Sequence, residues 1–172
     1  MDAIAELKRK NEEIAARFKT VEERIAAAAG PVLLFEAWIE AMTSAFAIPF
    51  LWISLTDHPD NAPLIDILGA SPRLADRLNV IDDEILLGLL PEGTTPVLVN
   101  EGLRPFFRLL PKNKYLVRSL AVAPLTDRTG RISGSLNHGD SLPGRYDPRM
   151  DTSLLRSLAA RVSVRLMEVG TS

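Results

Sequence analysis

The chain has 172 residues and a formal net charge of −2 with both signs interspersed, which excludes the electrostatic footprint of a nucleic-acid or anionic-membrane binder. With 47% hydrophobic residues it matches an average globular domain and can build a core without disulfides or metals. It contains no cysteine, which excludes a thiol nucleophile, a cysteine-ligated metal site and a thioether-linked chromophore.

The N-terminal sequence is acidic and has no apolar run, so we expect no secretory signal. The most apolar stretch, residues 31–55, is interrupted by Glu36, Glu40 and Pro49. A membrane-spanning helix needs about 20 mostly apolar residues, and this stretch does not supply them. We therefore expect a cytoplasmic protein that does not contact a membrane.

The first predicted element is a long helix with a narrow apolar seam over residues 4–28. Its apolar positions alternate in steps of three and four residues, as the a and d positions of a heptad repeat do. We expect the seam to join two chains in a parallel coiled coil, with an interface made of Ile4, Leu7, Asn11, Ile14, Phe18, Val21 and Ile25. An asparagine at an a position pairs with its symmetry mate in such a coil. The alternative is an amphipathic helix that folds back on its own chain.

A Gly-Pro pair at residues 30–31 ends this helix and divides the chain into a dimerisation helix, residues 1–30, and a domain of residues 31–172. Apolar side chains at helical spacing predict a helix over residues 35–46. Residues 50–55, which are rich in β-forming side chains, predict a strand.

A polar turn follows, and residues 64–68 predict a short second strand. Between residues 71 and 90 the pattern is helical, with Asp82 as the expected cap of a helix that starts at Asp83. Residues 96–99 predict a third, edge strand.

Two further strands, residues 117–125 and 131–137, are predicted to form a hairpin. Asp127 and Gly130 fit a type I turn that closes through a left-handed glycine. We expect Leu120 and Leu136 to share one apolar face of the sheet, with small residues on the other. Asp147 and Pro148 then predict the start of the last helix. This order suits an α+β fold, an antiparallel five- or six-stranded sheet with helices on one face.

Five short stretches carry a resemblance to a known family: NEEIA at 11–15, IPFLWISL at 48–55, GSLN at 134–137, RYDP at 145–148 and DTSLL at 151–155. They resemble an uncharacterised bacterial family of GAF-like proteins, domain of unknown function 484. The resemblance implies a GAF fold, with helices behind the sheet and a ligand pocket in front of it. It also implies homodimers that form through helices.

The sequence offers no catalytic constellation, so we expect a protein that is not an enzyme and holds no metal or cofactor. Bilin-binding and methionine sulfoxide reductase members of the GAF class use cysteines, which this chain lacks. Asn113 and Lys114 match the start of a cyclic-nucleotide motif, but no Asp-Glu pair follows them. The acidic residues 82–84 are interpreted as a helix cap, and His58 lies in a polar turn.

Candidate ligand-binding residues are the polar side chains near the predicted strand ends: Arg118, Asn137, His138, Arg104 and Tyr115. Antiparallel pairing in the hairpin is expected to bring Arg118 close to Asn137 and His138. The guanidinium group suits a carboxylate or phosphate ligand, and a histidine can titrate near neutral pH.

The sequence thus predicts a dimeric GAF-like sensory or regulatory module that binds an unidentified small molecule. Its terminal helices would carry the signal to a separate output protein. The alternative is a structural dimerisation adaptor with the same fold and a pocket filled by its own side chains.

Overall fold

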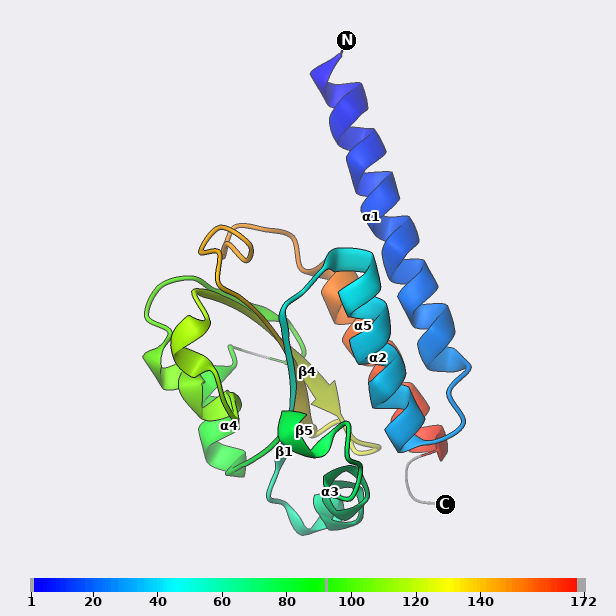
Figure 1. Cartoon of the computed structure of the whole chain (residues 1–172), viewed down its shortest axis with the longest axis vertical. Helices are drawn as coiled ribbons and strands as arrows, with labels where there is room; N and C mark the ends of the chain where they lie inside the picture. Colours follow the sequence, from blue (N-terminus) through cyan, green and yellow to red (C-terminus); the bar gives the residue numbers. More distant parts are fainter. Residues whose placement is uncertain (1, 92, 170–172) are drawn as a thin grey trace.

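The structure, a computed structural model, describes residues 2–91 and 93–169 and is built around a five-stranded sheet (Figure 1). The strands are β1 (Phe50–Thr56), β2 (Leu78–Ile81), β3 (Val97–Val99), β4 (Ser119–Thr126) and β5 (Ile132–Asp140). The helices are α1 (Ala3–Ala26), α2 (Pro31–Phe46), α3 (Ala62–Gly69), α4 (Asp83–Leu89) and α5 (Ser153–Val169). Short 3₁₀ turns are η1 (Pro59–Asn61), η2 (Ala75–Arg77), η3 (Arg104–Leu109) and η4 (Lys114–Leu116).

The sheet is mixed, with the strand order β2-β1-β5-β4-β3. β1 pairs antiparallel with β5, but it pairs parallel with β2, with Ile53 opposite Leu78. The expectation of an antiparallel sheet is therefore wrong at this edge. Parallel neighbours need a crossover connection, and the segment that contains α3 provides it.

The second predicted strand is also wrong, because residues 64–68 belong to the helix α3. Pro63 occupies the first turn of this helix, where its missing N–H costs nothing. Residues 64–68 form a short run of leucine and isoleucine with Asp66 at its centre, and such a run does not distinguish a strand from a helix. The strand that pairs with β1 is instead β2, which lies in the stretch with the helical pattern.

The hairpin of β4 and β5 is confirmed. The amide of Gly130 donates to the carbonyl of Asp127 (3.0 Å), and Gly130 has a φ of 83°, which favours glycine. The shared face expected for Leu120 and Leu136 is wrong, because Leu136 lies opposite Ala123 and Leu120 lies opposite Gly139. Side chains alternate between faces, so Leu120 and Leu136 are buried on opposite sides of the sheet.

One core lies between the sheet and the helices α2 and α5. Phe35 and Trp38 of α2 and Leu158 of α5 are fully buried there with Leu136 of β5. Burying an apolar side chain of this size contributes roughly 1.5–3 kcal/mol to stability. This packing holds α2 and α5 flat against the sheet.

The other face of the sheet is covered as well, which corrects the expectation of helices on one face only. Leu86 of α4 and Leu109 of η3 are fully buried against Leu120 and Val122 of β4. The predicted cap of α4 is confirmed, since the Asp82 carboxylate accepts from the amides of residues 84 and 85.

The helix α1 is packed in its second half and exposed in its first. Val21 and Ile25 are buried in the core of the same chain, and Phe18 packs partly against it. The Arg165 guanidinium of α5 donates to the carbonyl of Ala28 (2.7 Å) and fixes the end of the segment. Val21 and Ile25 are therefore not part of an intermolecular seam, and residues 18–28 share the core of the domain expected to begin at residue 31.

The first half of α1 extends past the rest of the molecule, as Figure 1 shows for the blue end of the chain. Ile4 is 76% exposed, Leu7 60% and Ile14 39%, and Asn11 is also exposed. The heptad spacing is thus divided between an intramolecular contact and an uncovered stripe.

The last helix begins at Ser153, so the predicted start at Asp147 and Pro148 is wrong. The Asp147 carboxylate instead accepts hydrogen bonds from the guanidinium of Arg149. The Asp151 carboxylate accepts a hydrogen bond from the Ser153 amide (2.8 Å). Residues 141–152 thus remain a loop that crosses the end of the sheet. Among the described residues, none of the helices has the length and apolar character needed to cross a membrane.

Candidate functional site

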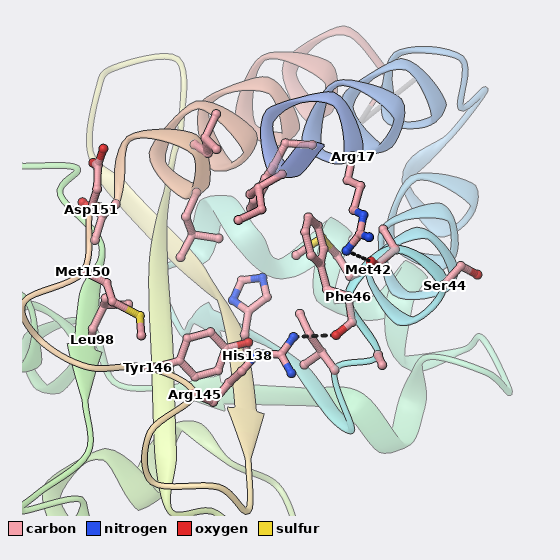
Figure 2. Close-up of a pocket in the computed structure, with 18 residues that line it drawn as sticks. Arg17, Met42, Ser44, Phe46, Leu98, His138, Arg145, Tyr146, Met150 and Asp151 are labelled. Atoms are coloured by element: carbon pink, nitrogen blue, oxygen red, sulfur yellow. Dashed lines mark hydrogen bonds between the residues drawn. The ribbon is translucent and has the colours of Figure 1, made fainter. Parts of the chain in front are cut away.

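A partly open cavity of about 550 Å³ lies on the helix side of the sheet, lined by α1, α2, the start of α5, the end of β5 and the 141–152 loop (Figure 2). We call it the helix-side cavity. Its walls are mainly apolar and include Phe18, Met42, Phe46, Ile48, Leu154 and Leu155. It forms where α1 leaves the core and the loop before α5 bridges the gap, so elements distant in sequence meet around it.

The loop side of the cavity is fixed by Arg145. Its guanidinium donates to the Asp140 carboxylate (3.3 Å) and to the carbonyl of Phe46 at the end of α2. Tyr146, next in sequence, lines the cavity, and Figure 2 shows its ring beside His138. Burial raises the pKa of the Tyr146 phenol to about 12 against the opposing charge of Arg145, so this group stays neutral.

His138 of β5 lies at the centre of the site, with an imidazole that is 1% exposed. Its Nδ1 lies 3.1 Å from the carbonyl oxygen of Ala121, and its ring makes an edge-to-face contact with Trp38 at 5.4 Å between centroids. Its Nε2 is buried and has no hydrogen-bond partner among the described residues. Burial lowers the pKa of His138 to about 4, so the ring is neutral at physiological pH.

Asn137 precedes His138 but points to the other face of the sheet, because successive strand residues alternate. Its amide donates to Oγ of Ser54 (2.9 Å) and to the carbonyl of Leu109 (3.3 Å), and its oxygen accepts from Oγ of Ser135 (2.8 Å). These buried bonds hold η3 against the sheet. Asn137 therefore serves packing on that face and does not share a site with His138.

The remaining candidate residues lie on the surface and away from the cavity wall. Arg118 precedes β4, its side chain is exposed, and its backbone amide donates to the carbonyl of Asp140 (2.8 Å). The register sets Ala121, not Arg118, opposite His138. Arg104 is exposed at the start of η3, and Tyr115 is 78% exposed with its ring edge against Phe107. The five predicted residues are therefore not gathered into one site.

Several cavity residues escaped the sequence reasoning. Arg145 and Tyr146 belong to the RYDP stretch that carries the family resemblance, and Arg17 and Phe18 lie in the predicted coiled-coil helix. The one sequence feature that could have indicated a site here is the adjacent arginine and tyrosine shortly after the end of a predicted strand. Their contact with α1 and α2 depends on tertiary packing that no local pattern encodes.

The resemblance implies a pocket on the face opposite the main helices, and that region is occupied. Leu86, Leu109 and Val122 are all 0% exposed there, and the amide of Asn137 bonds across to η3. The helix-side cavity thus lies on the opposite face of the sheet from the pocket that the resemblance implies.

The cavity has the chemistry of a binding site, because its wall is mainly apolar and contains one buried polar side chain, His138, whose Nε2 has no partner among the described residues. Within residues 2–91 and 93–169, no three histidine or acidic side chains are grouped to hold a metal ion. Arg17 stands at the α1 edge with one long hydrogen bond to the Ala45 carbonyl (3.4 Å), which leaves donors of its exposed guanidinium available to a ligand or to water.

We also compared the chain with known proteins. It matches none of the protein-family models and none of the curated proteins against which it was compared. The kinship with GAF-like proteins therefore stays a prediction from the five short stretches.

Proposed function

We propose that this chain is a GAF-like regulatory module that binds a small molecule in the helix-side cavity. The observation that carries the proposal is that His138 lines a mainly apolar cavity and that its buried Nε2 has no hydrogen-bond partner in the part of the chain that the structure describes. Folded proteins seldom leave such an atom unpaired, because the lost bond to water costs roughly 1–3 kcal/mol. A ligand that supplies the missing partner regains that free energy when it binds.

The size and lining of the cavity favour binding over a purely structural role. A volume of about 550 Å³ falls in the usual range of small-molecule sites. An adaptor with a filled pocket is the alternative, and its description fits the other face of the sheet, where Leu109 and Val122 close the packing. The two faces differ in this respect, and the mainly apolar cavity beside His138 lies on the helix side.

The position of α1 supports a route from the ligand to the rest of an assembly. Ile14, Arg17 and Phe18 of α1 line the cavity, whereas Ile4 and Leu7 lie in solvent. A ligand that packs against Phe18 would stabilise α1 in its packed position and so orient the exposed half of the helix. A separate output protein would read that change.

The proposal includes a parallel homodimer through the exposed half of α1. Ile4, Leu7, Asn11 and Ile14 follow heptad spacing on a segment that extends past the core. The side chains of Ile4 and Leu7 are not covered by their own chain, so a second helix would bury them. A second copy offers the same stripe, and the asparagine favours a register in which the two copies of residue 11 meet.

Indole is a suitable probe for the test, since it is small, apolar and uncharged. The expected result is a titratable change in amide NMR signals that is concentrated on Phe46, His138 and Leu155. The variant Ala45→Phe, which places a large side chain in the cavity, should abolish these changes in the NMR signals. The variant Ala160→Phe, on the exposed side of α5, should leave them intact. An unchanged spectrum of the wild-type protein, or equal responses from the two variants, would contradict ligand binding in this cavity.

A further inference from the structure

The protonation pattern of His138 follows from its neighbours. Nδ1 faces the carbonyl oxygen of Ala121 at 3.1 Å, and a carbonyl oxygen can only accept. Nδ1 therefore carries the proton and donates it to this bond. In a neutral imidazole with a protonated Nδ1, the other nitrogen has a lone pair and no hydrogen.

A doubly protonated ring has little support in this environment. Burial disfavours the charged form, and the wall around the ring is mainly apolar. The nearest acids of the loop side are engaged elsewhere: Asp140 pairs with Arg145, and the Asp151 carboxylate accepts from the amide and hydroxyl of Ser153. His138 thus presents a hydrogen-bond acceptor and not a cation.

We infer that the ligand of the helix-side cavity is an apolar molecule with a hydroxyl or N–H group that donates a hydrogen bond to Nε2 of His138. This inference rests on the proposed function and specifies its ligand class: phenols, apolar alcohols or heteroaromatic N–H compounds. A carboxylate or phosphate placed against Nε2 of His138 would meet a lone pair instead of a donor, so an anionic group is disfavoured at this atom, whereas the Arg17 guanidinium lies at the α1 edge of the cavity. This ligand class differs from the carboxylate or phosphate that the Arg118 guanidinium would suit.

The matched probes for the test are indole and benzofuran, which have nearly the same shape and differ in a ring N–H against a ring oxygen. A neutral hydrogen bond contributes about 0.5–1.5 kcal/mol, so we expect indole to bind roughly two- to tenfold more tightly than benzofuran. In His138→Phe the aromatic wall is kept and the acceptor is lost, so the two probes should bind equally. NMR titration of each protein gives both dissociation constants.

The possible outcomes separate the two proposals. Equal binding of indole and benzofuran to the wild-type protein would overturn the inference about the donor and leave the cavity as a ligand site. Binding of neither probe would overturn the proposed function, and the inference would fall with it. An indole preference that persists in His138→Phe would assign the acceptor to another group and overturn the role of His138.

Ring-nitrogen NMR of the wild-type protein provides a second readout that needs no variant. The free protein should show a protonated Nδ1 and an unprotonated Nε2 at neutral pH. Indole should shift the Nε2 resonance in the direction of a hydrogen-bonded acceptor, while benzofuran should leave it unchanged. A protonated Nε2 in the free protein would overturn the inference.

Discussion

Asn137 and His138 are neighbours in β5, but they lie on opposite faces of the sheet and in opposite situations. The amide of Asn137 is bonded to Ser54, Ser135 and Leu109, and that face is closed by α4 and η3. His138 makes one bond, to the Ala121 carbonyl, and its other nitrogen has no partner among the described residues.

The difference shows how one strand can serve structure on one side and binding on the other. The side chain of Asn137 has its hydrogen-bond partners within the chain, so a ligand would find no unpaired atom on it. On the helix side, α1 diverges from the core and a loop crosses the gap, so a hollow remains beside an unpaired acceptor. The following predictions test this contrast.

The largest expected effect on stability comes from a substitution in the backbone of the sheet, which both faces share. A Cβ atom added at Gly134 of β5 would lie 2.1 Å from the backbone oxygen of Ser54, which blocks the pairing of β1 and β5. We expect Gly134→Ala to destabilise the fold by more than about 4 kcal/mol or to prevent folding. At Gly139 the nearest atoms are side-chain atoms at 3.1–3.3 Å, so Gly139→Ala should cost far less. Urea unfolding of both variants gives the comparison, and similar costs would contradict it.

The next effect is the dependence of stability on pH. The pKa of His138 is about 4 in the folded protein against an ordinary value of 6.5, so the unfolded state binds the proton more readily. The contribution of His138 to the free energy of unfolding is therefore fully present above pH 6.5. It is lost as the pH falls from 6.5 to about 4, by roughly 3 kcal/mol in all. The His138→Phe variant should lose this slope. An identical pH profile in both proteins, measured by urea unfolding, would contradict a buried neutral imidazole.

A smaller effect is expected when the two neighbours are replaced at neutral pH. Asn137→Ala removes the buried bonds to Ser54, Ser135 and Leu109, at a cost of roughly 1–3 kcal/mol. His138→Phe removes one bond and an unpaired nitrogen, so its change in unfolding free energy should stay within about 1 kcal/mol. A larger loss at His138 than at Asn137 would reverse the assignment of structure to one face and binding to the other.

The smallest change in stability is expected on the exposed half of α1. Leu7→Glu should barely alter the unfolding of a dilute sample, because the side chain is 60% exposed. It should instead weaken the homodimer in sedimentation equilibrium, while Leu87→Glu on α4, 49% exposed, should not. A dimer that survives the first substitution, or a wild-type monomer, would argue against a seam at residues 4–14.

Local features of the fold were predictable from sequence. The turn at Asp127–Gly130 and the cap at Asp82 depend on side chains that bond to their own backbone within a few residues. The parallel pair of β1 and β2 was not predictable, because Leu64–Leu68 fits a strand as well as a helix until the crossover is known. The heptad spacing of α1 predicted a helix with an apolar stripe, but it did not show that Val21 and Ile25 pack within their own chain.

The site was predictable only in part. His138 was among the candidates because it ends a strand of the hairpin, and the structure puts it in the cavity wall. Arg118 and Asn137 were grouped with it by counting residues along the hairpin, but alternation sends Asn137 to the other face and leaves Arg118 on the surface. The cavity itself is lined by Phe18, Phe46 and Tyr146. These residues are far apart in the sequence, so no local pattern predicts that they line the same cavity.

Native mass spectrometry tests the central claim most directly, namely that the helix-side cavity holds a small molecule. The protein would be purified from its own host beside the Ala45→Phe variant prepared in the same way. The account predicts that the wild-type protein carries an added mass beyond that of the 18.9 kDa chain or of its dimer, which collisional activation releases, and that the variant carries none. The bare mass in both samples, or the same added mass in both, would contradict it.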